Sequence, residues 1–481
     1  MLPRTRPRSL EDLIVQVAII RPGPIVGKAV NPYVRNRQRR LRNPRAPIRY
    51  DHPALEPVLR ETLGVVLYQE QVLEVAMALA GFTAGQAESL RRAMSRKRSR
   101  EAMTRFWVQF REGAMARGAS SEVAKEVFKK LLGFAAYGFP KSHSAAFAVL
   151  AYQSAWLRRY YPAEFTCALF NNQPMGFYPP HVLVNDAKRH GVRILPPDVN
   201  RSRARCGVEG RAVRIGFGHV TGIGEEAALA VEREREARGP YRSLADFVRR
   251  APLAREAVEN LVVVGAFDDF GLSRREALWQ LGLFVPPRRV GRQGVAEASG
   301  KQLPLALPVG QDMVALRPMT AWEQMSADYE TLGLSPHYHP LGLLRPHLPP
   351  EVVTTVDLED LPDGITIQLA GLVVCRQRPG TAKGITFLLL EDERGLVNVI
   401  VFPDLYAEQR LLVRSEPFLV VEGRLQRREG TINVVATRLR TLEEAHRTFL
   451  PPPELPAQER GPHHVDGKPD RALAPAAHDF Y

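Results

Sequence analysis

The alternation of hydrophobic and polar residues divides the chain into a helical part and a strand part. From Leu10 to about Pro197, apolar residues recur at the three- and four-residue spacing of amphipathic helices. From Ile365 to Leu442 the period changes to two, and β-branched runs are separated by turns. Between these parts we expect short helices joined by glycine turns, and then a proline- and glycine-rich linker with one short helix near Trp322.

Three helices can be predicted within the helical part. Thr83 followed by Gln86 has the spacing of a capping box and predicts the start of a helix. The apolar face of that helix consists of Ala87, Leu90 and Met94. Two further helices are expected over Glu122–Leu132 and Ser144–Tyr160.

The strand part predicts a small β-barrel. Its five expected strands are Thr366–Val374, Ile385–Glu391, Val397–Phe402, Phe418–Gln426 and Ile432–Arg440. A short helix is expected over Asp404–Leu412, between the third and fourth strands. This order is typical of an OB-fold. The predicted fold class is therefore multidomain α+β, with a helical N-terminal part and a C-terminal five-stranded OB-fold barrel.

OB-folds bind single-stranded nucleic acid through a basic groove and stacking aromatic rings. Here the charge would come from Arg376, Arg378, Lys383, Arg424, Arg427 and Arg428. Phe387 and Phe402 are candidate stacking residues, although aromatic residues in strands more often belong to the core.

A glycine-containing motif, Val220-Thr221-Gly222-Ile223-Gly224, leads into a helix rich in Glu and Ala. This pattern fits a helix–hairpin–helix motif, in which backbone N–H groups at a helix N-terminus hold a DNA phosphate without reading bases. A second hairpin is expected over Leu261–Phe267, with its turn at Gly265. The alternative is that the glycines serve ordinary turns.

Composition and charge indicate the kind of partner. The 66 Lys and Arg residues exceed the 52 Asp and Glu residues, which gives a net charge of +14 and indicates a polyanionic partner. No apolar run approaches the roughly 18 residues of a spanning helix, so a membrane partner is not expected. The N-terminus does not have the pattern of a signal peptide, and the three cysteines lie far apart. These features favour the cytoplasm.

The positive charge is concentrated in two places. Residues 1–50 contain twelve Lys or Arg and two acids, a balance of 12 − 2 = +10. The second cluster consists of Arg91, Arg92, Arg96, Lys97, Arg98 and Arg100. Local clustering is expected of a surface that contacts phosphates, although a solvated basic tail would give the same count in residues 31–49.

The segment Tyr137–Ser144 places a lysine, two hydroxyls and a histidine at the start of a helix. Helix N-termini favour anions, so Lys141, Ser142 and His143 could hold a phosphate. The alternative is that a serine only caps the helix and that the histidine packs locally. The polar run Gln69-Glu70-Gln71 forms a polar patch at the entry to an otherwise apolar helix, and the alternative is an exposed helix start.

Several motifs together resemble one family. They are Arg21-Pro22-Gly23-Pro24, Tyr68-Gln69-Glu70-Gln71, Leu90-Arg91-Arg92-Ala93-Met94, the Tyr137–Ala146 segment, Tyr161-Pro162-Ala163-Glu164-Phe165 and Ile194–Asn200. In this order they resemble the fingers of bacterial C-family DNA polymerases, the α-subunit of DNA polymerase III and its error-prone relatives. The resemblance covers roughly residues 9–445, and the short C-terminal tail is similar to the error-prone branch.

The resemblance implies roles for individual residues. Arg91, Arg92, Lys141, Ser142 and His143 would bind the triphosphate of an incoming dNTP and hold it for attack by the primer 3′-hydroxyl. Gly222, Ile223 and Gly224 would bind duplex DNA. The segment Gln302-Leu303-Pro304-Leu305-Ala306-Leu307 resembles the family's sliding-clamp motif without its terminal aromatic residue, and a plain linker is the alternative. Translesion accessory proteins are further expected partners.

One departure from the family concerns catalysis. These enzymes hold two Mg²⁺ ions with palm carboxylates, and this sequence contains no Asp-x-Asp motif. No catalytic or metal-binding residue is therefore assigned. We expect the chain alone to be inactive, because it begins almost at the fingers. The two functions left open are part of an error-prone, translesion DNA polymerase and a non-catalytic DNA- or clamp-binding module.

The expected domain organisation follows from these patterns. Residues 1–200 would form the fingers and 201–290 a tandem helix–hairpin–helix domain, followed by a linker at 291–363. The OB-fold would occupy 364–445, and a disordered tail 446–481.

Overall fold

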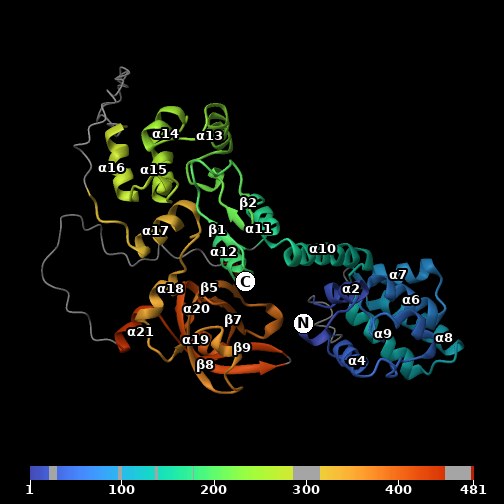
Figure 1. The fold of residues 1–481 in the computed structure, drawn as a ribbon. Coiled ribbons are helices and arrows are strands. Elements are labelled where there is room, and N and C mark those ends of the chain that lie inside the picture. Colours follow the sequence, from blue (N-terminus) through green and yellow to red (C-terminus); the bar gives the residue numbers. More distant parts are fainter. Residues whose placement is uncertain are drawn as a thin grey trace, which may run out of the picture. The chain divides into compact units, whose positions relative to one another are not determined.

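The computed structural model describes eight stretches of the chain: residues 1–20, 30–95, 100–135, 139–176, 178–284, 315–428, 430–449 and 478–480. They form two compact units, one centred on Met1–Trp156 and the other on Leu157–Gln426 together with Ile432–Tyr481 (Figure 1). None of the helices in the described stretches is both long and apolar enough to cross a membrane.

The first unit is helical. Its elements are α1 (Leu2–Thr5), α2 (Leu10–Ile19), α4 (Val30–Arg42), a 3₁₀ turn (Pro53–Leu55), α5 (Glu56–Leu59), α6 (Gln69–Ala80), α7 (Ala84–Ser95), α8 (Arg100–Ala116), α9 (Ser121–Ala135) and the start of α10 (Lys141–Tyr160). The three predicted helices are confirmed as α7, α9 and α10. The predicted capping box opens α7, since the Gln86 N–H donates to Thr83 Oγ1 over 3.3 Å and the Thr83 N–H donates to Gln86 Oε1 over 2.9 Å.

The core of the first unit lies between α6, α7, α8 and α9. Ala87, Leu90 and Met94 are buried there, as their spacing predicts. The rings of Phe110 and Phe128 lie 5.2 Å apart in the same core. Gly113 allows α8 to approach the end of α6, because a Cβ at this position would stand 2.0 Å from the carbonyl oxygen of Ala80.

The second unit begins with helices that pack against the helix–hairpin–helix region. Its first elements are α11 (Pro162–Asn171), α12 (Pro180–Arg189), β1 (Arg193–Leu195), β2 (Gly207–Glu209), β3 (Ala212–Arg214), a 3₁₀ turn (Phe217–His219), α13 (Glu225–Arg238), α14 (Leu244–Arg250), α15 (Arg255–Val263), a 3₁₀ turn (Asp268–Phe270) and α16 (Arg274–Phe284). Strand β3 pairs in parallel with β1 and antiparallel with β2. One apolar core runs from Ala163 in α11 to Leu281 in α16. Residues from Ala163 to Val199, which were expected to belong to the fingers, contribute to this core.

The linker expected over 291–363 is ordered in the part that the structure describes. This part contains α17 (Ala321–Leu332), α18 (Pro340–Leu344), a 3₁₀ turn (Arg345–His347), β4 (Val352–Val353) and a 3₁₀ turn (Asp357–Glu359). Thr320 and Glu323 form a capping box at the start of α17, and Leu332 and Leu334 join the core of the helix–hairpin–helix region. The short helix expected near Trp322 is α17, and proline and glycine in this stretch mark turns between packed elements.

The C-terminal part is a closed β-barrel, as predicted. Its elements are β5 (Thr366–Gln377), a 3₁₀ turn (Gly380–Ala382), β6 (Thr386–Glu391), β7 (Leu396–Val401), α19 (Pro403–Glu408), α20 (Arg410–Ser415), β8 (Phe418–Arg428) and β9 (Thr431–Arg440). The strand order β5-β6-β7-β9-β8 closes where β5 pairs with β8. Alternating residues such as Val397, Val399 and Val401 fill the barrel core. The single helix expected between the third and fourth strands is two short helices.

The tail expected to be disordered from residue 446 has structure in the described residues. Helix α21 spans Leu442–Phe449, and β10 (His478–Phe480) pairs in parallel with Cys375–Gln377 of β5. The pairing of β8 with β5 ends at Leu372, so the backbone of β5 beyond that point is available to β10. Residues 450–477 and Tyr481 lie outside the described stretches.

Candidate nucleotide and nucleic-acid interfaces

The cations predicted to hold a triphosphate lie on two helices of the first unit. Arg91 and Arg92 are on α7, and Lys141, Ser142 and His143 form the first turn of α10, which begins three residues earlier than predicted. The ammonium of Lys141 lies 2.6 Å from Glu61 Oε2. The backbone N–H of Lys141 donates to both carboxylate oxygens of Glu70, each over 3.1 Å. The N-terminus of α10 is therefore capped by a carboxylate from α6.

The two arginines share one carboxylate on their own helix. Arg91 donates two hydrogen bonds of 2.8 Å to Glu88, and Arg92 Nε donates to the same carboxylate over 2.7 Å. Hydrogen bonds from Arg91 and then Arg92 lower the pKa of Glu88 to about 2. The pKa of Arg91 is raised mainly by Glu88, and Glu70 adds to this effect. Arg91 and Lys141 therefore both lie within electrostatic reach of Glu70.

The backbone holds α6 and the start of α10 together. Tyr68 and Phe139 form a parallel β-bridge, in which the Gln69 N–H donates to the Phe139 carbonyl over 3.1 Å. Gln71 is buried rather than exposed: its Oε1 accepts the Leu67 N–H over 2.8 Å, and its Nε2 donates to Thr62 Oγ1 over 2.9 Å. The alternative that residues 69–71 are an exposed helix start is therefore wrong for Gln71, which fixes the turn that precedes α6.

The serines and the histidine of the α10 motif have different surroundings. Ser142 and His143 are exposed, and the His143 ring lies between Phe139 and Phe147, with centroids 4.8 Å and 4.5 Å away. Ser144 is fully buried, and its hydroxyl has no hydrogen-bond partner among the described residues. Ser144 is thus not the helix cap that sequence reasoning considered, because Glu70 has that position.

Sequence reasoning missed the two carboxylates that contact Lys141. Glu70 lies within a polar run that was noticed, but Glu61 carries no local signal. Both are at least 71 residues from Lys141 along the chain, so no helical spacing could reveal the contacts.

The predicted hairpin at 220–224 has the geometry of a tight turn before a helix. Gly222 is exposed with φ +84°, a conformation that favours glycine, and Gly224 is the N-cap of α13. Ile223 is buried and anchors the turn in the core. Two neighbours hold Thr221: its N–H and hydroxyl donate to the Thr331 carbonyl of α17 over 3.0 Å and 2.7 Å, and its own carbonyl accepts from Asn260 over 2.8 Å.

The second expected hairpin has its turn at Gly265, where φ is +83°. The N–H of Gly265 donates to the Val262 carbonyl, and the N–H of Ala266 to that of Leu261, which ends α15. Asp268 pairs with Arg274 over 3.5 Å at the start of a 3₁₀ turn, so it has a structural role there.

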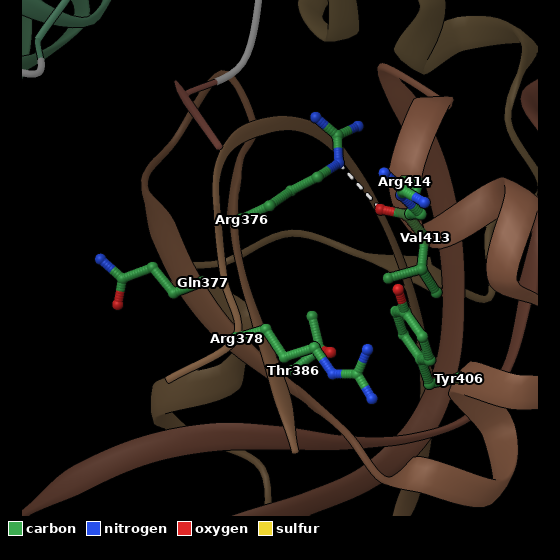
Figure 2. A pocket seen from close by; sticks show the side chains of 7 residues that line it. All are labelled: Arg376, Gln377, Arg378, Thr386, Tyr406, Val413 and Arg414. Atoms are coloured by element: carbon green, nitrogen blue, oxygen red, sulfur yellow. Dashed lines mark hydrogen bonds between the residues drawn. The ribbon is translucent and has the colours of Figure 1, made fainter. Parts of the chain in front are cut away.

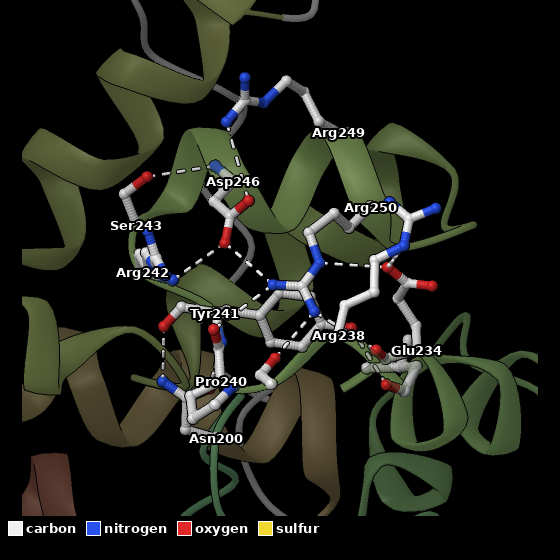
Figure 3. Close-up of polar contacts among 12 residues, drawn as sticks. Asn200, Glu234, Arg238, Pro240, Tyr241, Arg242, Ser243, Asp246, Arg249 and Arg250 are labelled. Atoms are coloured by element: carbon white, nitrogen blue, oxygen red, sulfur yellow. Dashed lines mark hydrogen bonds and ion pairs between the residues drawn. The ribbon is translucent and has the colours of Figure 1, made fainter. Parts of the chain in front are cut away.

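A polar cluster centred on Arg250 stiffens the helices behind the first hairpin (Figure 3). Arg250 bridges Glu234 of α13 and Asp246 of α14, over 3.1 Å and 3.0 Å, and its guanidinium lies 4.5 Å from the Tyr241 ring. Asn200 clamps the same turn, because it exchanges two hydrogen bonds of 2.9 Å and 2.8 Å with the backbone of Tyr241. The cluster therefore ties α13, the helix that follows the hairpin, to α14.

On the barrel, one predicted DNA-binding residue is largely buried. Arg376 is only 7% exposed, and it donates to the backbone carbonyl of Val413 over 2.8 Å (Figure 2). It also donates to the carbonyl of Glu416 over 2.6 Å. Its guanidinium thus satisfies carbonyls at the C-terminal end of α20, where a cation is electrostatically favoured, and it stabilises the barrel.

The other predicted residues of the barrel lie nearer the surface. Arg378 is exposed and its guanidinium stacks 4.2 Å from the centroid of Tyr406, while Lys383 is exposed in the loop between β5 and β6. Phe402 is 46% exposed at the end of β7, Phe387 is half-buried, and Arg427 is half-buried near the end of β8. A small pocket lies beside Arg378, lined by Arg376, Gln377, Arg378, Thr386, Tyr406, Val413 and Arg414 (Figure 2).

Two further predictions concern a clamp-binding motif and the absence of a metal site. The candidate clamp residues Gln302, Leu303, Leu305 and Leu307 lie outside the described residues. In the stretches that the structure describes, no three His, Cys, Asp or Glu side chains gather in a way that could hold a metal ion.

Three family models match the chain in sequence order. Residues 1–118 match the finger domain of the bacterial DNA polymerase III alpha subunit. Residues 191–277 match a helix–hairpin–helix motif, and residues 367–442 match an OB-fold nucleic acid binding domain. These matches and the fold place the chain in the class of nucleic-acid-binding proteins with polymerase fingers.

Named relatives make the family more specific. The chain is 44% identical over 447 residues to an error-prone DNA polymerase of Anaeromyxobacter sp. (strain K), which is 90% of this chain and 38% of that protein. It is 46% identical over 442 residues to the error-prone DNA polymerase of Mycolicibacterium paratuberculosis, covering 91% of this chain and 39% of the relative. The homologues of the chain are thus named bacterial error-prone DNA polymerases, and the chain spans about two fifths of the length of these relatives.

Comparison with solved structures is less informative. An asparaginyl-tRNA synthetase from Pyrococcus horikoshii in complex with asparaginyl-adenylate aligns at 25% identity over 20% of this chain and 23% of that chain, with a TM-score of 0.18.

Proposed function

We propose that this chain provides the fingers, the duplex-binding region and the OB region of an error-prone DNA-directed DNA polymerase. Such an enzyme adds deoxynucleotides to the 3′ end of a primer and copies damaged templates. The observation that carries the proposal is the identity of 44% to error-prone DNA polymerases over nine tenths of the chain. The order of the finger, helix–hairpin–helix and OB matches supports it.

In this function the fingers bind the incoming dNTP. Arg91, Arg92 and Lys141 would neutralise the β- and γ-phosphates, and Ser142 and His143 would complete the contact at the start of α10. The closeness of Arg91 and Lys141 to Glu70 supports a single cationic site. Polymerases need divalent metal ions for the transfer step, and palm carboxylates of the full enzyme would hold the Mg²⁺.

The second unit would bind the nucleic acid. The exposed backbone of Gly222 and Gly224 would face a duplex phosphate, with Ile223 as the anchor in the core. Arg378, Lys383 and Arg427, with the exposed ring of Phe402, would contact single-stranded template. A sliding clamp would bind at Gln302–Leu307, and translesion accessory proteins would be further partners.

The test is the affinity of the purified chain for primer–template DNA as a function of salt, measured by fluorescence anisotropy. Binding through phosphates predicts a linear fall of log K with log salt, with a slope of about −0.9 for each phosphate neutralised. Single-stranded, double-stranded and primed DNA are compared, and primed DNA should bind best because it engages both the hairpin and the barrel. Absence of DNA binding at low salt would contradict the proposal.

A further inference from the structure

Each cation that the proposed function assigns to the triphosphate is engaged by a carboxylate of the fingers. Glu61 lies 2.6 Å from the ammonium of Lys141, and Glu70 accepts the backbone N–H of the same residue. Glu88 holds Arg91 and Arg92. The negative charge that a triphosphate would bring is therefore already supplied by side chains.

We propose that Glu61 and Glu70 are placeholder carboxylates, which occupy the anion positions beside Lys141 and withdraw when a triphosphate binds. This inference rests on the proposed function, because it concerns the same site. It assigns the two residues a role in selecting the ligand: an anion must carry enough charge to displace them. A triphosphate meets this condition better than a single phosphate group.

The contacts of Lys141 are of a kind that can exchange. The side chains of Lys141 and Glu61 are 46% and 33% exposed, and exposed ion pairs contribute only about 0–1 kcal/mol. The attachment of Glu70 is also a surface contact, with two hydrogen bonds to one N–H. Several phosphate oxygens at the same position would form more charge-assisted hydrogen bonds than one carboxylate can.

Glu88 differs from these two residues. It lies on the same helix as Arg91 and Arg92, three and four residues away, so it moves with them. Glu88 accepts hydrogen bonds from both arginines within one helix, so it can keep them oriented toward a bound triphosphate. Placeholder behaviour is specific to the carboxylates that meet Lys141 from other helices and loops.

The test is a calorimetric titration of the full chain with inorganic tripolyphosphate. Glu70→Gln and Glu61→Gln each remove one charge and keep an oxygen that can accept a hydrogen bond. Each variant should bind tripolyphosphate roughly two- to fivefold more tightly than the unchanged chain, which is the effect of losing an exposed ion pair. Inorganic phosphate, titrated in parallel, should gain affinity in the variants by a larger factor than tripolyphosphate does, so that selectivity for the triphosphate falls.

Asp51→Asn is the matched control. Asp51 pairs with Lys130 over 2.7 Å, and the side chains of Lys130 and Asp51 are 53% and 32% exposed, so the pair closely resembles that of Lys141 and Glu61. This variant loses the same charge without touching Lys141, and its affinity should be unchanged. A gain equal to that of Glu61→Gln would overturn the proposal, since it would show an effect of net charge alone.

Two outcomes separate this inference from the function on which it rests. If Lys141→Ala weakens tripolyphosphate binding but neither Gln variant strengthens it, the triphosphate site stands and the placeholder role is wrong. If Lys141→Ala has no effect, the assignment of the triphosphate site itself fails. Weaker binding by the Gln variants would also overturn the inference, because it would mean that the carboxylates hold Lys141 in its binding position.

Discussion

Two buried polar side chains in this chain, those of Arg376 and His339, form hydrogen bonds with backbone groups and so stabilise the fold. Arg376 was expected at a DNA surface, yet it bonds two carbonyls of α20. His339 is a second example. It is buried, and its Nδ1 accepts the N–H of Leu341 at the start of α18 over 3.2 Å. Only a neutral imidazole can accept in this way, so the fold depends on the protonation state of His339.

His339 should make the protein sensitive to acid. Burial is the main cause that lowers the pKa of His339 to about 3, whereas an unfolded histidine has a pKa near 6.5. Between these values the unfolded chain binds more protons, so the free energy of unfolding falls as the pH falls through this window. Between pH 7 and pH 5 the loss from this residue is about 2 kcal/mol.

The variant His339→Asn tests whether His339 causes this loss of stability at low pH. Asparagine can also cap a helix and does not titrate. Urea unfolding midpoints of both proteins at pH 7 and pH 5 should show a larger acid loss in the unchanged chain than in the variant. Equal losses would mean that His339 does not carry the acid sensitivity.

At the scale of helices and strands, sequence patterns predict what depends on neighbours along the chain. The capping box of Thr83 and Gln86 and the period of two in β7 could both be predicted from the sequence, because the residues that form them lie close together in the chain. Contacts between distant segments could not be predicted in this way. The tie between Glu61 and Lys141, the packing of α17, and the pairing of β10 with β5 each need the folded chain to bring their partners together. The burial of Arg376 has the same reason.

Close contact between α6 and α8 depends on one glycine. Gly113→Ala would place a methyl group 2.0 Å from the Ala80 carbonyl oxygen, so the helices would have to separate. We expect a loss of roughly 1–3 kcal/mol, as for overpacked cores. Thermal unfolding followed by circular dichroism measures it. Gly85→Ala in α7 is the control, since a Cβ there meets nothing within 4 Å, and its midpoint should not fall.

The hairpin before α13 offers a second pair of glycines. At Gly222, φ of +84° makes Gly222→Ala strained by about 1–2 kcal/mol, whereas Gly224 has φ of −74° and open space around it. Gly222→Ala should distort the turn and weaken binding to duplex DNA by roughly tenfold. Gly224→Ala should change it much less. Equal DNA affinities for both variants, measured by anisotropy, would argue against phosphate binding at this turn.

At the scale of the second unit, a buried charge joins the helix–hairpin–helix region to the barrel. Glu391, at the end of β6, is fully buried and accepts from Asn185 and Arg189 of α12, each over 3.0 Å. Burial, the largest influence, raises the pKa of Glu391 to about 6. Arg189 is the partner that compensates its charge.

Replacing Arg189 should cost more stability than replacing Glu391. Arg189→Ala leaves a buried carboxylate without its cation and should cost roughly 3–5 kcal/mol, whereas Glu391→Ala leaves a partly exposed arginine and should cost less. The cost of Arg189→Ala should shrink as the pH falls below about 6, because the carboxyl then takes up a proton. Urea unfolding at pH 8 and pH 5 measures both effects. A larger loss for Glu391→Ala would contradict the account.

For the whole molecule, the central claim is that the fingers bind a nucleoside triphosphate in a chain that also binds DNA. The most direct measurement is a titration of the chain, saturated with primer–template DNA, with a dNTP followed by calorimetry, for the unchanged protein and for Arg91→Ala combined with Arg92→Ala. The account predicts saturable binding that the double variant weakens by at least roughly tenfold, while its DNA affinity stays the same. Equal dNTP binding by the two proteins would contradict it.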